Sequence, residues 1–422
     1  MGKKITFIHA SDLHLGAPFR GLRALSPAWA DRLLSAIPEA YDRVIDAAVS
    51  NRVDFVVFAG DIFDTSRASY ADYLHFFSGI SRLGVAGISV YLCTGNHDPY
   101  TSWQHDFFAL PENATMFAAD KPSFATYSRE GEVLALLGGR GYYNQTWPAS
   151  EDISAGISRA AAVEATGVEA PFAVAVLHTG LHFDSTKAPC NPDDLLSRGM
   201  DYWALGHIHK RFMDDPANPH LAFSGCIQGR DIKETGERGV LLVTLEQGAP
   251  NRADFIPTAS VAWQRMKVNV AQCGSIAEIG EKIVRELFRA NGEARCEEMC
   301  TRITLTGKTA LHRLLRRPDV LDDLRKNIND AYPMFFCDAL IDATVQPIDK
   351  EALAREKLFP SVFLQVSAAQ IEDTEGAKAF LQEEFVKKNF RLPGAVERRA
   401  NTLCAEAENL VLDLLLGQGD AS

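Results

Sequence analysis

The chain has 422 residues, of which 46% are hydrophobic and 23% charged, the balance of a globular protein with two or three domains. It contains no run of eighteen or more apolar residues, so no membrane-spanning helix is expected. The formal net charge of -12 argues against a broadly basic surface for binding nucleic acid. An anionic partner would have to be attracted by local basic patches or by bound metal ions.

The eight cysteines are scattered and form no CxxC pair. Cys296 and Cys300 are the closest in sequence, but no matching second pair exists to complete a structural zinc site. We therefore expect reduced, mostly buried thiols in a cytoplasmic protein.

The first 260 residues alternate between short apolar runs and longer segments, which predicts a layered α/β fold. The helix in this region is expected over about 28–51. Loops that follow the strands are the usual place for functional sites on such sheets. The expected strands cover 5–8, 53–59, 88–93, 133–137, 172–177, 202–205 and 239–245.

The pattern changes near residue 260, and a smaller αβ domain is expected over 261–348. Ser275 and Glu278 form a capping box that predicts the start of a helix. Strands are expected over 301–305 and 339–345, with a helix between them. From 349 to 422 the chain is expected to be a helical segment.

The end of this helical segment carries a regular apolar pattern, which we call the terminal seam. Its members recur at gaps of 4, 3, 4, 3 and 4, the period of a coiled-coil surface. One interpretation is that the helix binds a partner and does not support the fold; the other is that it packs on the chain itself. The terminal seam comprises Val396, Ala400, Leu403, Ala407, Leu410 and Leu414.

Five short motifs place metal-binding types of side chain directly after expected strands. In an extended segment, residues two apart point the same way, so Asp12 and His14 are expected to face one point. The same applies to His207 and His209. Mixed carboxylate, amide and imidazole donors favour manganese, iron or zinc. The motifs are Asp12-Leu13-His14, Gly60-Asp61-Ile62-Phe63-Asp64, Gly95-Asn96-His97-Asp98, His178 and Gly206-His207-Ile208-His209.

The order of these motifs resembles that of the calcineurin-like metallophosphoesterases. The longer strings SDLHLG at 11–16, AGDIFDT at 59–65 and DYWALGHIH at 201–209 are similar to the SbcD subunit of the bacterial SbcCD nuclease. SGCIQGR at 224–230 is similar to its YhaO-like branch. The resemblance covers about 1–260 and implies a metallophosphoesterase β-sandwich flanked by helices. It leaves 261–348 as a capping and DNA-binding domain and 349–422 as a partner-binding segment.

The resemblance also implies the role of each motif residue. His97 would be the catalytic acid, and Asp64 would support the loop without binding metal. One metal would be held by Asp12, His14, Asp61 and His209; the second would be held by Asp61, Asn96, His178 and His207. Independently of the resemblance, the position of Asp98 next to His97 in the sequence suggests that Asp98 holds its tautomer.

The implied activity is that of a Mn²⁺-dependent DNA repair exonuclease that works with an SbcC-like coiled-coil ATPase and forms a homodimer. Two divalent ions would lower the pKa of an attacking water and offset charge on the phosphate. The alternatives are a metallophosphoesterase acting on nucleotides or phosphoproteins, and a catalytically weak DNA-binding scaffold.

A basic cluster in the second domain is a candidate DNA contact. Three of its members are Arg313, Arg316 and Arg317, followed by acidic residues at 319, 322 and 323. The cluster is expected to contact the phosphate backbone. The alternative is an ordinary solvated helix face.

Overall fold

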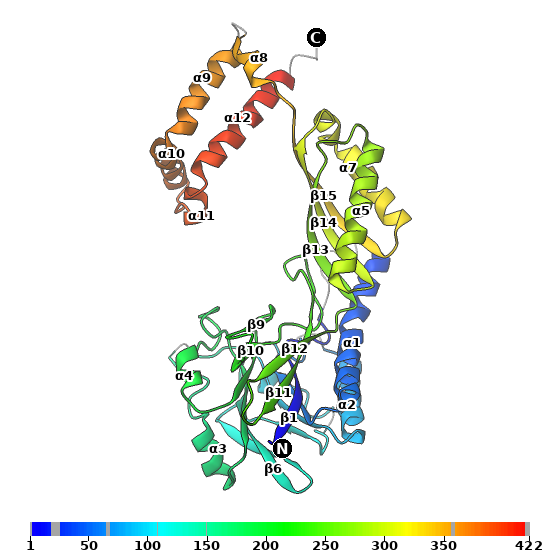
Figure 1. Ribbon diagram of the computed structural model, residues 1–422, viewed down its shortest axis with the longest axis vertical. Helices are drawn as coiled ribbons and strands as arrows, with labels where there is room; N and C mark the ends of the chain where they lie inside the picture. Colours follow the sequence, from blue (N-terminus) through cyan, green and yellow to red (C-terminus); the bar gives the residue numbers. More distant parts are fainter. Residues whose placement is uncertain are drawn as a thin grey trace. The chain divides into compact units, whose positions relative to one another are not determined.

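The computed structural model describes residues 2–17, 26–64, 68–107, 109–148, 150–355 and 359–417 (Figure 1). Residues 356–358 and 418–422 of the expected partner-binding segment lie outside this description. The chain divides into two compact units, each described by itself below. The first comprises Met1–Arg265, Leu287–Arg302 and Tyr332–Asp338; the second comprises Met266–Glu286, Ile303–Ala331 and Ala339–Ser422.

Two six-stranded sheets form the centre of the first unit. In the first sheet, with strand order β12-β11-β1-β2-β3-β4, the strands β1 to β4 run parallel, and β11 is antiparallel to both β1 and β12. Its strands are β1 (Lys4–Ala10), β2 (Phe55–Ala59), β3 (Ser89–Cys93), β4 (Ala114–Met116), β11 (Gly239–Glu246) and β12 (Arg252–Pro257).

The second sheet has the order β5-β6-β7-β8-β10-β9, with β6, β7, β8 and β10 parallel. Both edge strands are antiparallel to their neighbours. The strands are β5 (Ser123–Arg129), β6 (Glu132–Arg140), β7 (Phe172–His178), β8 (Tyr202–Gly206), β9 (Phe212–Met213) and β10 (Leu221–Phe223).

Helices cover the outer face of each sheet, so the unit has four layers (Figure 1). The helices α1 (Pro27–Ser50) and α2 (Tyr70–Val85) pack on the first sheet, and α3 (Arg159–Thr166) and α4 (Pro192–Leu196) on the second. Phe7 and Phe55 of the first sheet meet Tyr202 of the second in the core between the sheets. The predicted α/β fold with helix-flanked sheets is therefore confirmed.

Helix α1 shows how the sequence produces one of these layers. Ser26 caps its first turn by accepting a hydrogen bond from the amide of Trp29, and Pro27 stands in the first turn, where its missing N–H costs nothing. Leu33, Ile37 and other apolar residues at helical spacing are buried against the sheet. The expected bounds of 28–51 differ from the observed ones by one residue at each end.

The parallel arrangement places the site. The strands β1, β2 and β3 of one sheet and β7 and β8 of the other run parallel within their sheets. Loops after parallel neighbours emerge at the same edge of a sheet. All the candidate metal ligands follow or end these five strands.

A three-stranded sheet follows the first two, in the order β13-β14-β15. Half of the predicted capping box forms: the amide of Glu278 donates to Ser275 Oγ at 3.2 Å, whereas the Glu278 carboxylate accepts from the amide of Gly274 and not from that of Ser275. Ile279, Ile283 and Leu287 are fully buried, as the helical pattern predicts. The elements are β13 (Val261–Asn269), α5 (Ile276–Ala294), β14 (Glu298–Lys308), α6 (His312–Leu315), α7 (Pro318–Ala331) and β15 (Phe335–Val345).

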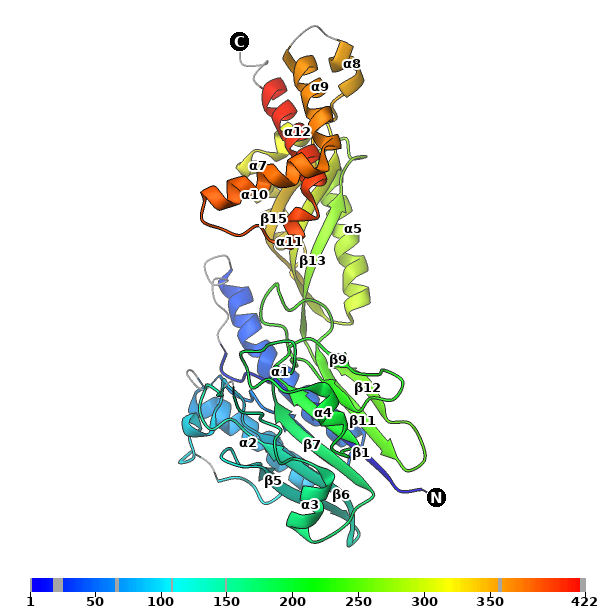
Figure 2. The same ribbon diagram turned by 90° about the vertical axis from the view of Figure 1, so that its left-hand side faces the viewer.

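The end of the chain is helical, as predicted, and its last helix packs on the helices before it. Figure 2 shows α12 lying along α9, and α12 also packs against α10. Within α12, Ala400 and Leu412 are buried. The helices are α8 (Lys350–Arg355), α9 (Phe359–Glu372), α10 (Thr374–Lys387), α11 (Gly394–Glu397) and α12 (Ala400–Gly417).

Polar contacts also join α12 to α6, within the second unit. The Asp413 carboxylate lies 2.7 Å from Arg316 Nη1 and 3.2 Å from His312 Nε2. Of the terminal seam, Ala407, Leu410 and Leu414 are exposed, whereas Ala400 is buried. The interpretation that this helix packs on the chain itself is therefore confirmed, and the binding of a partner stays a prediction.

None of the helices in the described parts of the chain combines the length and apolar character needed to cross a membrane. All eight cysteines are free thiols, and five of them are buried.

Leu412→Ala should destabilise the helical segment by about 2–5 kcal/mol, because it opens a cavity at a fully buried side chain. Leu414→Ala is the matched control, since that side chain is 51% exposed and its loss should cost less than about 0.5 kcal/mol. Urea unfolding followed by circular dichroism measures both. Equal effects of the two substitutions would contradict the packing described here.

Candidate metal centre

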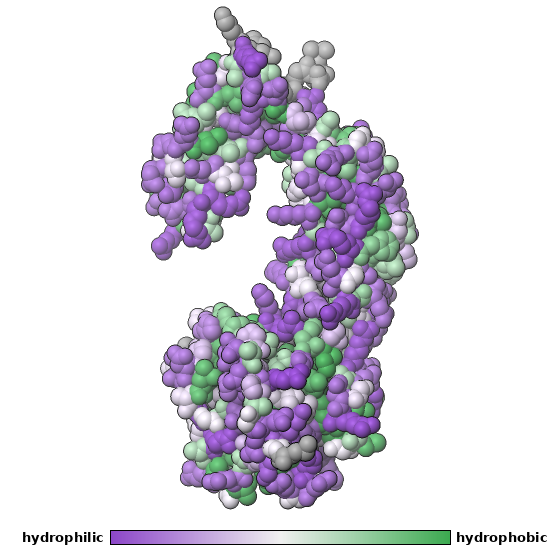
Figure 3. Space-filling view, in the orientation of Figure 1, coloured by the Kyte–Doolittle hydropathy of each residue, from purple (hydrophilic) through white to green (hydrophobic). Residues whose placement is uncertain are grey.

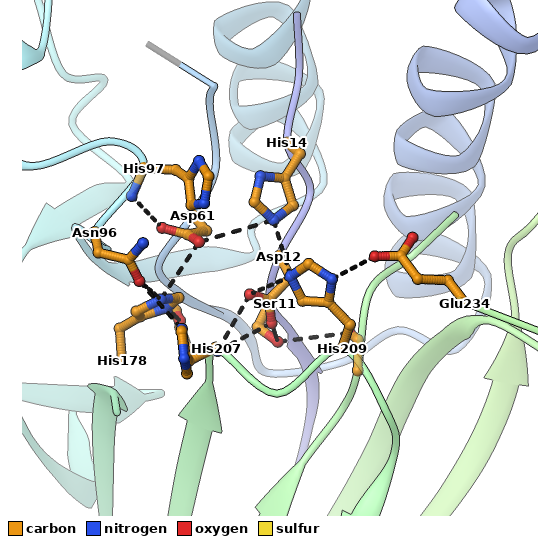
Figure 4. Close-up of polar contacts among 12 residues, drawn as sticks. Ser11, Asp12, His14, Asp61, Asn96, His97, His178, His207, His209 and Glu234 are labelled. Carbon is orange, nitrogen blue, oxygen red and sulfur yellow. Dashed lines mark hydrogen bonds and ion pairs between the residues drawn. The ribbon is translucent and has the colours of Figure 1, made fainter. Parts of the chain in front are cut away.

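The candidate ligands come together from loops at the ends of five strands (Figure 4). They form two groups, each with one carboxylate and two imidazoles whose donor atoms lie within 4.8 Å of one another. The first group is Asp12, His14 and His209, and the second is Asp61, His178 and His207.

In the first group the two imidazoles face each other. His14 Nε2 lies 3.2 Å from His209 Nε2, and His209 Nε2 lies 3.6 Å from Asp12 Oδ1. His14 and Asp12 are buried, whereas the His209 side chain is 25% exposed. The first group is therefore shielded from solvent at Asp12 and His14 and accessible to solvent at His209.

In the second group an amide oxygen joins the imidazoles. Asn96 Oδ1 lies 3.1 Å from both His178 Nε2 and His207 Nδ1. Asn96 and His178 are buried, and the His207 side chain is 14% exposed. These three side chains provide one neutral oxygen and two nitrogens around one point.

Asp61 is a member of the second group and also faces the first. Its Oδ2 lies 3.7 Å from His14 Nε2 and 3.4 Å from His178 Nε2. Its other oxygen, Oδ1, accepts a hydrogen bond of 2.8 Å from the amide of His97. Oδ2 itself is buried and accepts no hydrogen bond from the described residues. One oxygen is thus fixed by the backbone, and the other is directed between the two groups.

These residues fit a pair of divalent cations. A buried carboxylate oxygen without a hydrogen-bond donor is costly unless a cation compensates it. Two imidazole nitrogens 3.2 Å apart, as in His14 and His209, are likewise suited to share a cation between them. Carboxylate, amide and imidazole together form a donor set for transition-metal ions.

Electrostatics show that the centre requires positive charge. Burial raises the pKa of Asp61, but attraction to His178 and then His14 outweighs it and holds that pKa well below its usual range. Burial lowers the pKa of His178, but Asp61 outweighs burial and raises it to about 9. A protonated imidazole here occupies the electrostatic role that a bound cation would take, so metal binding must release this proton.

The pKa values of the other three imidazoles, His14, His207 and His209, are shifted in different directions. Burial lowers the pKa of His14 well below its usual value, and the positive charge of Arg230 lowers it further. Burial also lowers the pKa of His207. For His209 burial is outweighed by the hydrogen bond to Glu234 and the charge of Asp12, so its pKa is raised. Neutral imidazole is the form that binds metal, and His14 and His207 are held in it.

The backbone at the ligands is strained. Asp12, His14 and Asp61 have φ angles of 53°, 51° and 52°, and His207 has a φ of 102°. Non-glycine residues seldom adopt positive φ, and such strain concentrates at functional sites. The expectation that Asp12, His14 and His207 lie in extended segments is therefore wrong. Left-handed turns, not strand pleating, aim the side chains at one point.

Glycines make room for this arrangement. A Cβ on Gly60, whose φ is +80°, would lie 2.6 Å from His178 Nδ1. A Cβ on Gly95 would clash with Asp61 Oδ1, and one on Gly206 with the carbonyl oxygen of Ala59. The glycine in each of these motifs is explained by a close approach to a ligand or to its supporting strand.

Supporting residues orient three of the imidazoles. His178 Nδ1 lies 3.0 Å from the Ala59 carbonyl oxygen and His209 Nδ1 lies 2.5 Å from Glu234 Oε1, which leaves Nε2 of each ring facing the centre. His207 is reversed, with Nε2 3.2 Å from Asp184 Oδ2 and Nδ1 facing Asn96. Such partners fix the tautomer of metal ligands.

Glu234 and Asp184 were missed by sequence reasoning. Neither lies in a motif with a ligand, and the separations of 25 and 23 residues from their histidines carry no periodic signal. Ser11 begins the SDLHLG string, but no role was predicted for its side chain. Its Oγ donates to Asp12 Oδ2 at 2.6 Å. These carboxylate and hydroxyl contacts exist only once the loops have folded together.

Asp98 has a different role from the expected one. Its carboxylate accepts hydrogen bonds from the amides of Gly95, Asp61 and Ile62 at 2.7, 3.0 and 2.9 Å. Burial, reinforced by the charge of Asp61, raises the pKa of Asp98 to about 8. The expectation that Asp98 holds the tautomer of His97 is therefore wrong: it fastens the Asp61 loop to the loop that carries Asn96.

His97 is exposed beside the centre, with its ring centroid 4.9 Å from that of His14. The amide of Asp64 donates to the Leu15 carbonyl oxygen at 3.0 Å, and the metal-binding groups of the described residues do not include its carboxylate.

The candidate DNA contacts lie in the second unit. Arg316 pairs with Asp413 and Arg317 with Asp319 at 2.6 Å, while Arg313 lies in α6.

Comparison with known proteins agrees with this geometry. The family model "Calcineurin-like phosphoesterase" matches residues 5–211, and "Metallophosphoesterase YhaO, middle domain" matches 263–344. A relative from Bacillus subtilis (strain 168), "Uncharacterized metallophosphoesterase YhaO", is 33% identical over 317 residues, 74% of this chain and 74% of that protein. The chain belongs to the calcineurin-like phosphoesterase family. Members are hydrolases of phosphoester bonds that use divalent metal ions.

More distant relatives are named as DNA repair proteins. "DNA double-strand break repair protein Mre11" from Aeropyrum pernix is 25% identical over 301 residues, covering 69% of this chain and 70% of that protein. The protein of the same name from Thermoplasma acidophilum is 25% identical over 260 residues, covering 57% of this chain and 62% of that protein.

Gly95→Ala should abolish binding of divalent metal, because its Cβ would displace the Asp61 carboxylate from both groups. Gly87→Ala is the control, since a Cβ there meets nothing within 4 Å, although its φ of +72° adds some strain. Isothermal titration with Mn²⁺ measures both proteins, and circular dichroism checks that both are folded. Normal metal binding by folded Gly95→Ala protein would show that the position of Asp61 is not critical.

Proposed function

We propose that this chain is a two-metal, Mn²⁺-dependent phosphodiesterase that acts on DNA as an exonuclease of the SbcD type. The observation that carries the proposal is the Asp61 carboxylate, whose buried Oδ2 lies within 3.7 Å of imidazoles from both ligand groups. A carboxylate placed in this way would help to hold two cations, which in two-metal sites stabilise the attacking and leaving oxygens of a phosphodiester.

The ligands divide as the sequence motifs suggest. One ion would be held by Asp12, His14, Asp61 and His209, and the other by Asp61, Asn96, His178 and His207. When bound, the ions supply the positive charge that activates a water and stabilises the phosphate as it is attacked. The imidazole-rich donor set favours Mn²⁺ over Mg²⁺.

His97 is assigned to proton transfer. Its backbone amide is fixed on Asp61 Oδ1, so the residue cannot drift from the centre, while its side chain is exposed to substrate. From this place a ring nitrogen would donate the proton that the leaving oxygen needs when the P–O bond breaks. Asp61 thereby positions both the ions and the acid.

DNA as substrate is supported by the Mre11 relatives, whose name describes double-strand break repair. Arg313, Arg316 and Arg317 remain candidate backbone contacts. Arg316 shares its charge with Asp413, and Arg317 shares its charge with Asp319.

A partner protein is supported by the helical segment, over which Figure 3 shows apolar side chains among polar ones. Phe359, Val362 and Val366 of α9 are each more than half exposed and follow helical spacing, and Leu410 and Leu414 of α12 are similarly exposed. Exposed apolar stripes are typical of protein interfaces. We propose the coiled coil of an SbcC-like ATPase as occupant; a homodimer is the other proposed assembly.

Hydrolysis of bis-p-nitrophenyl phosphate and of linear duplex DNA should require added Mn²⁺ and stop with EDTA, and Mg²⁺ alone should support little. The reason is the imidazole-rich ligand set. Full activity of metal-free protein in EDTA would rule out the two-metal mechanism. Hydrolysis of the small diester without any cleavage of DNA would be consistent with the two-metal mechanism but would refute DNA as the substrate.

His97→Ala should bind Mn²⁺ normally and lose about 10²–10⁴ in the rate of diester hydrolysis, the usual effect of removing a general acid. His75→Ala, a partly exposed histidine of α2 that pairs with Asp42, is the control and should keep full activity. Metal titration and steady-state kinetics test both. Loss of an ion in His97→Ala would make His97 a ligand instead.

A further inference from the structure

A pocket of about 930 Å³ adjoins the loop that carries the catalytic histidine. Exposed aromatic rings and one arginine line it together with an amide side chain, and none of these belongs to the metal centre. The lining residues used below are Tyr100, Asp120, Arg140, Tyr143, Trp147 and Glu151.

The aromatic rings are held in a fixed arrangement. Tyr100 and Tyr143 are stacked, with ring centroids 6.0 Å apart and planes 21° apart, and both side chains are more than 40% exposed. The Arg140 guanidinium lies over the Trp147 ring, 4.7 Å from its centroid. Solvent-exposed π faces of this kind are costly surface unless a planar partner covers them.

The pocket lies close to the metal centre, with Tyr142 packed between them. The amide of Tyr100, three residues after His97, donates to the Tyr142 carbonyl oxygen at 2.9 Å. The Tyr142 ring lies 5.7 Å from the ring of His178 and 5.5 Å from that of Trp147, measured between centroids. One buried tyrosine thus packs between a metal ligand and a pocket ring, so the pocket and the centre are neighbours.

Charge in the pocket favours a nucleobase over a phosphate group. Arg140 Nη2 donates to the Asp120 carbonyl oxygen at 2.8 Å, while Arg140 Nε is buried and has no partner among the described residues. Asp120 and Glu151 expose carboxylates at the rim, which repel phosphate but can accept hydrogen bonds from the N–H groups of bases. Stacking on aromatic and arginine faces is the usual way in which proteins bind unpaired bases.

We propose that this pocket binds an unpaired nucleobase of the DNA strand whose phosphodiester lies at the metal centre, with Tyr100 and Tyr143 as the stacking platform. The proposal rests on the proposed function. Binding the base outside the duplex would place the phosphate beside it next to His97. The pocket therefore selects single-stranded or frayed ends, with little preference of sequence, because every base has a π face.

The test compares two diesters with the same leaving group, of which only thymidine 5′-(p-nitrophenyl phosphate) carries a base. Tyr143→Ala should lower kcat/KM for this diester about tenfold or more, mainly through KM, and change that for methyl p-nitrophenyl phosphate less than about twofold. Tyr143→Phe should keep wild-type values, because stacking needs only the ring. Phe380→Ala, an exposed aromatic of α10, is the control. Equal loss on both diesters, or no loss on either, would overturn the proposal.

Binding gives a readout that needs no catalysis. Fluorescence anisotropy in EDTA should show that fluorescein-labelled oligothymidylate binds more tightly than the same strand with abasic sites, and that Tyr143→Ala removes the difference. If the wild type hydrolyses neither diester, the proposed function fails while this measurement still decides the base pocket. Equal binding of both strands would refute a site for a DNA base. Displacement of the labelled strand by thymidine monophosphate, at concentrations no higher than those at which unlabelled oligothymidylate displaces it, would refute a site for a DNA strand.

Discussion

The position of the Asp61 carboxylate is the constraint on which the rest of the catalytic unit depends. It is buried, and its Oδ2 accepts no hydrogen bond from the part of the chain that the structure describes, so its negative charge is not satisfied by hydrogen bonds there. His178 offsets part of that charge when protonated, at the cost of holding its pKa near 9. A dication bound by these residues would offset the charge of Asp61 and displace the proton from His178.

Holding Asp61 in place requires strained backbone, and a network of main-chain hydrogen bonds maintains it. The amides of Asp12 and His14 donate to the carbonyl oxygens of Gly60 and Asp61 at 3.1 and 3.0 Å. Asp98 ties the Asp61 loop to the next one through three amides. Each left-handed ligand residue is therefore fixed by a neighbouring loop, and the glycines leave space for the closest approaches. This preorganisation explains why the ligands converge from five strands.

The sequence predicts the ligand set's composition better than its geometry. The motifs around Asp12, Asp61, Asn96 and His207 are local, and the alternation of strands and helices brings them to one edge of the sheets, so their convergence follows from chain order. Their backbone conformation does not, because positive φ angles at Asp12 and Asp61 are imposed by contacts between loops. Glu234 and Asp184 could not be predicted for the same reason. In the terminal helix, periodicity identified an apolar pattern, but the neighbouring α9 and α10 decide which face is buried.

The most direct test of the central claim is to locate the ions. Anomalous diffraction from crystals soaked in Mn²⁺ should show two adjacent peaks that share the Asp61 carboxylate. Asp12, His14 and His209 should surround one peak, and Asn96, His178 and His207 the other. A single peak, or two peaks of which only one contacts Asp61, would contradict the account.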